Sequence, residues 1–302
     1  MKRILILYYT QTGQQLNILQ SLAKPLTDAG HHVFYQATEP EQDYAFPWSA
    51  FSFFNAFPEV FFQEPMALKK FSEKAFDDYD LVILGYQPWF LSPSRPISSF
   101  LQSNDGKRIL KDKPAITVIG CRNMWLNAQE KTKRRLLDAN AKLVGNVALI
   151  DRSSNLVSLV TILRWLLGGK KETFGITAGV SANDIEHAKE FGASINEALQ
   201  QNNFDNLQTQ LNNKGAVDIN PSLVLMERRG QKGFSIWSKF IAAGGTSQSL
   251  GRKIRVYIFM YLLPTAVVVL SPLLWTISKT MLIVKREVLQ KEVEYFKQNS
   301  LR

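Results

Sequence analysis

The sequence predicts an α/β protein built on a doubly wound sheet of five parallel strands in the order 2-1-3-4-5, followed by a hydrophobic helical segment. Two observations predict this architecture. Short apolar runs alternate with longer stretches of helical periodicity over residues 1–205, as they do where crossover helices join parallel strands. Residues 256–278 then form the longest uncharged run of the chain, 23 residues of mostly Val, Leu, Ile, Phe and Tyr.

The five predicted strands are short and apolar: residues 4–9, 32–36, 81–86, 115–120 and 143–150. Apolar residues three and four apart predict a first helix over residues 16–26, which Gly30 ends as a C-cap. Residues 66–76, 97–101 and 126–137 are predicted as crossover helices. A last helix starts at Ser181-Ala-Asn-Asp184, a capping-box pattern, and continues to Leu199. In a sheet of this order, ligands bind beyond the carboxyl ends of strands one and three.

The net charge of +10 is concentrated in the last quarter of the chain. Residues 1–225 carry 23 Lys and Arg against 22 Asp and Glu, whereas residues 226–302 carry 13 against 4. The main domain is therefore nearly neutral, and we expect no nucleic-acid partner. We divide the chain into a domain over residues 1–205, a basic connector over 206–251 and a membrane-associated helical segment over 252–302. The single cysteine, Cys121, and the lack of a leader before the first strand indicate a cytoplasmic domain.

Residues 256–278 are long enough to cross a membrane, since a helix rises about 1.5 Å per residue and the hydrocarbon layer is roughly 30 Å thick. Basic residues flank the run on both sides: Arg252, Lys253 and Arg255 before it, and Lys279, Lys285 and Arg286 after it. Such flanks favour anionic lipid headgroups, so we expect the chain at the cytoplasmic face of a membrane. Pro264 and Pro272 either kink a spanning helix or break the run into a monotopic hairpin, and we favour the hairpin.

Two insertions extend the predicted domain beyond a minimal five-stranded sheet. Residues 39–65 contain seven phenylalanines and Trp48, and a loop this aromatic either packs on the sheet as extra core or meets a membrane. Residues 155–169 are apolar and amphipathic, with Arg164 as the one charge, and are too short to span a bilayer. This second insertion either lies in the membrane interface or adds to the core.

A hydroxyl-rich turn, Thr10-Gln-Thr-Gly13, follows the first predicted strand and leads into the first helix. Backbone N–H groups and the helix dipole make such a turn an anion site, to which the threonines add hydroxyl donors. The turn lacks the lysine of a nucleoside-triphosphate loop and the glycines of a dinucleotide fingerprint. We therefore predict that a group of residues, Thr10, Gln11, Thr12, Gly13, Gln14 and Gln15, holds the single phosphate of FMN. The turn resembles the phosphate loop of the flavodoxin family, in which a hydroxyl residue stands in place of Gln15.

The loops after the third and fourth predicted strands are expected to hold the flavin ring. The residues concerned are Tyr86, Gln87, Pro88 and Trp89 in one loop, and Gly120, Cys121 and Trp125 in the other. Aromatic faces stack on a flavin, and backbone amides bond its pyrimidine edge. Arg122, Asn123 and Arg152 follow strands four and five and are the predicted catalytic donors to enolate charge. The alternatives are a solvated charge for Arg122 and a helix first turn for Trp125.

Beyond the turn, most of the chain is similar to a family known as dialkylresorcinol condensing enzymes. The resemblance is carried by YYTQTGQ, ILGYQPWFLSPS, VIGCRNMW and the stretch from KLVGN to IDR. It implies work beside a ketosynthase and a carrier protein on a resorcinol with two alkyl chains. Condensation by a ketosynthase needs an activated Cys with His and Asn or a second His, and the chain lacks such a set. We therefore predict an FMN-dependent aromatase that oxidises a dialkyl-cyclohexane-1,3-dione to the dialkylresorcinol.

Two other functions remain open on the sequence. One is a membrane-tethered, flavodoxin-like electron-transfer protein, although the near-neutral main domain lacks the acidic face typical of such proteins. The other is a domain without flavin that acts as a scaffold for a ketosynthase, which the departure at Gln15 would allow. No cluster of His and Cys has metal-ligand spacing, so we expect no metal.

Overall fold

The computed structural model describes residues 1–301, without the side chains of residues 264, 266–268, 270–276 and 278. Its centre is a parallel sheet of β1 (Arg3–Tyr8), β2 (His32–Ala37), β3 (Leu81–Tyr86), β6 (Pro114–Cys121) and β7 (Lys142–Ile150). The order across the sheet is β2-β1-β3-β6-β7. These labels differ from the predicted 2-1-3-4-5 because β4 (Pro88–Trp89) and β5 (Ser92–Pro93) form a separate hairpin between the third and fourth sheet strands.

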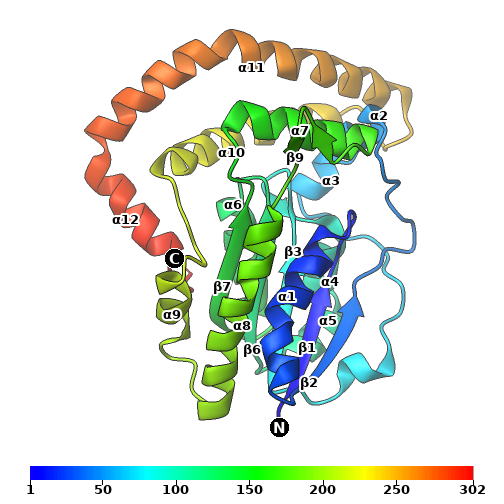
Figure 1. The fold of residues 1–302 in the computed structure, drawn as a ribbon. Helices are drawn as coiled ribbons and strands as arrows, with labels where there is room; N and C mark the ends of the chain where they lie inside the picture. Colours follow the sequence, from blue (N-terminus) through cyan, green and yellow to red (C-terminus); the bar gives the residue numbers. More distant parts are fainter. Residues whose placement is uncertain (302) are drawn as a thin grey trace.

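Helices cover both faces of the sheet (Figure 1). One face carries α1 (Gln14–Asp28) and α8 (Ala182–Gln201), which pack side by side; the other carries α4 (Arg95–Gln102), α5 (Asn104–Leu110) and α6 (Leu126–Asp138). Gly85 of β3 faces α1, and a Cβ there would come within 2.5 Å of Leu19. The missing side chain therefore allows α1 to approach the sheet closely. The predicted cap of α8 is confirmed, since Ser181 Oγ accepts a hydrogen bond from the Asp184 N–H at 3.0 Å.

The crossover helix predicted over residues 66–76 is wrong. A short 3₁₀ turn, Glu73–Phe76, is the helical structure that forms there. The preceding residues pair instead with the start of the aromatic insertion, where the Lys69 N–H donates to the Glu39 carbonyl at 2.8 Å. Backbone groups that are paired in this way have no need of a helix.

A layer of helices lies across the carboxyl ends of the strands (Figure 1). It contains α2 (Ala50–Asn55), α3 (Phe57–Phe61), α7 (Asn155–Gly168), α10 (Pro221–Ala242) and α11 (Leu250–Val284). Its core is aromatic: the buried ring of Phe57 stacks on Phe259 with centroids 5.2 Å apart and meets Phe234 edge-on at 5.0 Å. The α3 part of the aromatic insertion is thus extra core, which was one of the two alternatives.

The C-terminal part of the chain differs from the predicted monotopic hairpin. Residues 250–284 form one helix, α11, across Pro264 and Pro272, whose side chains lie outside the described residues. Within the described part of the chain, no helix combines the length and the apolar character needed to cross a membrane. Arg252, predicted to face lipid, instead has a side chain that is 3% exposed and pairs with Glu59 of α3 at 2.6 Å. The predicted connector contains α10 and a short helix, α9 (Leu207–Asn213).

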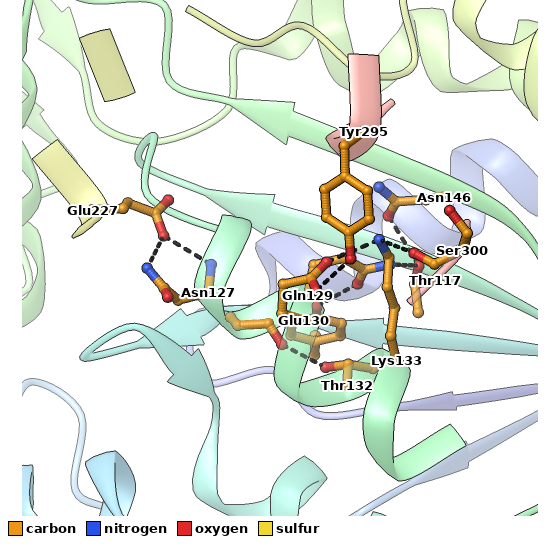
Figure 2. A network of polar contacts seen from close by, with 12 residues as sticks. Thr117, Asn127, Gln129, Glu130, Thr132, Lys133, Asn146, Glu227, Tyr295 and Ser300 are labelled. Carbon is orange, nitrogen blue, oxygen red and sulfur yellow. Dashed lines mark hydrogen bonds and ion pairs between the residues drawn. The ribbon is translucent and has the colours of Figure 1, made fainter. Parts of the chain in front are cut away.

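One buried carboxylate joins the helical layer to the sheet domain (Figure 2). Glu227 of α10 is 1% exposed and accepts hydrogen bonds from the N–H groups of Leu126 at 2.9 Å and Asn127 at 2.8 Å. The Asn127 side-chain amide donates to the same carboxylate at 2.8 Å. Glu227 therefore caps the N-terminus of α6, where the helix dipole favours a negative charge. Burial raises the pKa of Glu227, and these N–H donors oppose that rise.

The last helix, α12 (Arg286–Phe296), returns from the helical layer to the sheet domain. Tyr295 donates to Glu130 of α6 at 2.6 Å, and Lys133 donates to the same carboxylate at 2.9 Å and to the Ser300 carbonyl at 3.0 Å (Figure 2). Leu289 is 2% exposed and belongs to the main core. The far end of the predicted membrane segment is therefore packed on protein.

We expect Glu227→Ala to lower the free energy of unfolding by about 2–4 kcal/mol, because it leaves several buried donors of α6 without an acceptor. Chemical denaturation followed by circular dichroism measures the change. The matched control is Glu197→Ala on α8, an exposed glutamate, for which we expect a change within about 0.5 kcal/mol. Equal stability of the two variants would show that the cap is dispensable.

Candidate functional site

The turn after β1 leads into the N-terminus of α1, which has no side-chain cap. Gly13, the residue before the helix, has a φ of 81°, a left-handed conformation that glycine adopts without strain. N–H groups in the first turn of a helix have no partner within it and project toward the turn. Thr10 Oγ1 is buried beside them and has no hydrogen-bond partner among the described residues. The predicted phosphate turn therefore has the donors of an anion site.

The side chains of Gln14 and Gln15 are engaged elsewhere, which corrects their predicted role as phosphate contacts. Gln15 is 4% exposed; its amide donates to the Val118 carbonyl at 2.9 Å and accepts from the Gly120 N–H at 3.0 Å. Gln14 donates to the Val180 carbonyl at 3.0 Å and accepts from its N–H at 3.1 Å. The glutamine in place of a hydroxyl residue thus ties α1 to β6, and only its backbone N–H stays in the turn.

Two of the three aromatic side chains predicted to hold the ring are in the core. Tyr86 is fully buried on the α6 side of β3, where its hydroxyl donates to Gln129 at 2.8 Å. Trp125 is 1% exposed at the start of α6, as its alternative role predicted. Trp89 is half-buried on the β4–β5 hairpin and meets Tyr9 and Trp48 edge-on, each at 5.6 Å. Trp89 is therefore the one member of this predicted set that lies near the surface of the strand ends.

Unpartnered polar atoms mark the carboxyl ends of three neighbouring strands. The Thr10 hydroxyl after β1, Gln87 Oε1 after β3 and Asn123 Oδ1 after β6 are buried, and none has a hydrogen-bond partner among the described residues. Adjacent strands lie about 4.8 Å apart, so these three strand ends fall within roughly 10 Å of one another. Buried polar groups are normally paired, and each orphan costs about 1–3 kcal/mol. The structure thus brings three predicted site residues to an edge that a polar ligand would complete.

The two predicted catalytic arginines are in different environments. Arg122, after β6, donates to the Asn155 carbonyl at 3.0 Å and to Ser158 Oγ at 3.3 Å, both at the start of α7. Burial lowers its pKa, and within the described residues no carboxylate pairs with it. Arg152, after β7, has a side chain that is 63% exposed and pairs with Asp184 of α8 at 2.9 Å. The structure therefore keeps Arg122 beside the strand ends and engages Arg152 at a helix terminus.

Cys121 ends β6 and Asp151 follows β7, and the Asp151 N–H donates to the Cys121 carbonyl at 3.0 Å. Burial raises the pKa of the Cys121 thiol well above its usual range, so the group is protonated and weakly nucleophilic at neutral pH. Asp151, which the sequence analysis missed, is 4% exposed and accepts from the N–H groups of Ser153 at 2.9 Å and Gly179 at 3.1 Å. Its position directly after an apolar strand is the signal that could have identified it.

Lys131 of α6 is a second residue that the sequence analysis missed. Its ammonium group donates to Ser92 Oγ at 2.7 Å and to the Phe61 carbonyl at 3.1 Å, and lies 4.7 Å from the centroid of the Phe61 ring. Burial lowers the pKa of Lys131 to about 8. Several charged residues surround Lys131 in the sequence of α6, so the sequence pattern did not indicate that this lysine is buried.

Comparison with known proteins finds distant likeness to flavoprotein structures. No family model and no curated protein matches the chain. A Bacteroides eggerthii protein assigned as a flavoprotein covers 54% of this chain and 98% of its own, at 20% identity and a TM-score of 0.38. A flavoprotein in complex with FMN from Lactobacillus acidophilus covers 48% of this chain and 92% of its own, at 13% identity and a TM-score of 0.40. An NAD(P)H:quinone oxidoreductase from Methanothermobacter marburgensis covers 57% of this chain and 98% of its own, at 14% identity and a TM-score of 0.29. At such TM-scores the likeness carries no argument about cofactor or activity.

We expect the stability of this protein to rise with pH relative to a Lys131→Met variant. The folded-state pKa of Lys131, about 8, lies below the ordinary value, so between the two the unfolded chain binds more protons and each rise in pH favours the folded state. The relative gain between pH 7 and pH 9.5 is on the order of 2 kcal/mol. Urea denaturation of both proteins at the two pH values measures it, and a constant difference would contradict the burial of the charge.

Proposed function

We propose that this protein binds FMN at the carboxyl edge of its sheet and acts as an FMN-dependent oxidoreductase. The observation that carries the proposal is a set of buried polar atoms at three adjacent strand ends, on Thr10, Gln87 and Asn123, that have no partner in the described part of the chain. The uncapped N-terminus of α1 beside Thr10 adds backbone donors for a phosphate. The five-stranded order is also that of flavodoxin-like sheets, which bind FMN at this edge.

Each residue has a distinct proposed part in holding the cofactor. Thr10, Thr12 and the N–H groups from Gly13 onward would hold the phosphate, because the turn offers donors and carries no charged side chain. Gln87 and Asn123 would bond the polar edge of the ring, because their unpartnered oxygens accept hydrogen bonds. Trp89, half-buried beside them, would contact the ring face.

We further propose that the substrate is a dialkyl-cyclohexane-1,3-dione, which is oxidised to a dialkylresorcinol. The change removes one hydride and one proton from the ring, and bound FMN supplies the two-electron acceptor that this requires. Arg122 and Asn123 would donate to the oxygen of the enolised dione and stabilise its charge before the ring loses its hydride. The lowered pKa of Arg122 reflects a desolvated cation, and such a cation interacts strongly with an enolate.

We propose that the protein works at the cytoplasmic face of a membrane, beside the ketosynthase and carrier protein that supply a substrate with two alkyl chains. Exposed apolar side chains recur at helical spacing on the described part of α11. They are Leu250, Ile254, Tyr257, Tyr261 and Leu262. Basic residues lie among them, including Lys253. Such a stripe suits an interfacial helix that lies on anionic lipid.

The first test concerns Thr10. We expect purified protein to bind FMN with a visible absorption spectrum, and Thr10→Val to weaken FMN binding about tenfold or more, the worth of a hydrogen bond to a charged group. The stability of the flavin-free protein should not fall, because the lost hydroxyl has no hydrogen-bond partner among the residues that the structure describes. Thr27→Val, near the other end of α1, is the matched control. Fluorescence titration of FMN measures all three proteins, and equal affinity in Thr10→Val would place the phosphate elsewhere.

The second test concerns the proposed reaction. With a synthetic short-chain dialkyl-cyclohexanedione under anaerobic conditions, we expect resorcinol to form in step with loss of the oxidised flavin absorbance. Arg122→Gln should slow this by about a hundredfold, the scale of one lost donor to an oxyanion, without lowering the flavin content. Arg152→Gln removes an equal charge from an exposed ion pair and should change the rate less than twofold. A yellow protein that leaves the dione unchanged would support the electron-transfer alternative instead.

A further inference from the structure

A small β-hairpin follows α7 and carries a bulky apolar residue at its tip. β8 (Glu172–Thr173) and β9 (Ile176–Thr177) pair antiparallel, and the two turn residues between them are Phe174 and Gly175. Both have left-handed backbone conformations, with φ of 51° and 73°. A two-residue turn of this kind is normally made by Asn-Gly or Asp-Gly, because bulky residues rarely adopt a positive φ. Turn geometry therefore does not explain a phenylalanine at this position.

Packing does not explain it either. The side chain of Phe174 is 88% exposed, which makes it the most exposed large apolar residue of the described chain. Its described contact is with the Arg164 guanidinium, whose central carbon lies 5.6 Å from the ring centroid. Arg164 belongs to α7, so the hairpin tip is continuous with the outer face of that helix.

The outer face of α7 continues the apolar surface. Leu156 and Val160 lie four residues apart on α7 and are 70% and 51% exposed, and Arg164 is the next residue on the same stripe. Ile176, beyond the hairpin turn, is also exposed. We call these apolar residues with Phe174 the hairpin patch. The patch lies at the same end of the molecule as the carboxyl ends of the strands (Figure 1).

The charges around the hairpin patch are mainly basic. Residues 155–177 contain Arg164, Lys170 and Lys171 against one acidic residue, Glu172, and all four are exposed. Apolar side chains that project from a surface ringed by Lys and Arg match an anionic bilayer, in which the rings enter the interface and the cations meet the headgroups. An aqueous protein partner with an acidic face would use the lysines, but would leave Phe174 without a reason to project beyond them.

We propose that the hairpin patch is a docking site for anionic lipid, separate from α11, and that Phe174 enters the membrane interface. The inference extends the membrane association proposed above. Docking at this face would turn the carboxyl edge of the sheet toward the bilayer. The Asn155 contacts of Arg122 and Asn123 fix the start of α7 to the same edge, so a docked α7 holds the proposed dione site close to the lipid.

The test reads the hairpin tip directly in the full chain, so it does not depend on flavin content or turnover. In Phe174→Cys, the new thiol is labelled with the environment-sensitive fluorophore NBD; unmodified protein, with Cys121 as its only thiol, gives the background labelling. The probe is a set of vesicles made of phosphatidylcholine alone or with phosphatidylglycerol. We expect the anionic vesicles to shift the NBD emission to the blue and raise its intensity at least twofold. Leu137→Cys, an equally labelled site on α6 that is 63% exposed, should not respond.

A second pair of variants tests the charge. Replacing Lys170 and Lys171 with Ser in the labelled protein should weaken the response roughly fivefold for each lysine, the worth of one basic residue near an anionic surface. The control replaces Lys107 and Lys111, exposed residues that come just before the amino end of β6, and should leave the response unchanged. Two results would overturn the proposal. In the first, the protein co-sediments with vesicles but the NBD emission at position 174 does not change. In the second, the NBD emission shifts when the protein is concentrated without lipid. The second result would mean that another copy covers the patch.

Discussion

The helical layer of this protein depends on one interaction, the burial of the Glu227 carboxylate at the N-terminus of α6. A buried carboxylate is costly unless several donors surround it, and here two backbone N–H groups, one amide and the helix dipole do so. The donors belong to α6 and the acceptor to α10, so these hydrogen bonds form only when the two helices are in register. A shift of α10 along α6 would leave both the acid and the helix terminus unpaired.

Fixing α10 in turn positions the aromatic layer. Phe234, two turns along α10 from Glu227, meets Phe57 of α3, and Phe57 stacks on Phe259 of α11. The buried ion pair between Arg252 and Glu59 joins α11 and α3 a second time. The aromatic packing supplies most of the buried area, whereas the carboxylate and the ion pair fix the register of the helices. The layer over the strand ends is therefore held in one place while it remains apolar inside.

The sheet could be predicted from the sequence because its strands are buried on both faces and are read as continuous apolar runs. All five predicted strands overlap β1, β2, β3, β6 and β7. The error over residues 66–76 has a different origin. The backbone of Lys69 there pairs with Glu39, which is distant in sequence. Local periodicity carries no information about such a partner. The continuity of α11 across Pro264 and Pro272 was missed for a related reason, since a local proline signal was taken as a break.

The site was predictable in position and only in part in detail. Strand ends are fixed by the sheet, so Thr10, Gln87 and Asn123 reach one edge as expected. The pleat of a strand decides which face its last side chain points to. Tyr86 ends β3 and points toward Gln129 of α6, so it does not reach the edge. Gln15 shows the same limit: its residue type suggested a lost phosphate contact, and its length instead lets it reach β6.

The polar strand ends and the apolar helical layer above them favour different parts of a ligand. The edge offers oxygens and a hydroxyl that lack partners among the described residues, whereas the helices above it present phenylalanines and an outer surface rich in exposed apolar residues. A small polar metabolite would satisfy the edge but gain nothing from that surface, and a plain lipid would do the reverse. The proposed substrate, a ring with two oxygens and two alkyl chains, would match both when bound beside the proposed FMN. The excess of positive charge lies in residues 226–302, which contribute to the helical layer, whereas residues 1–225 are nearly neutral.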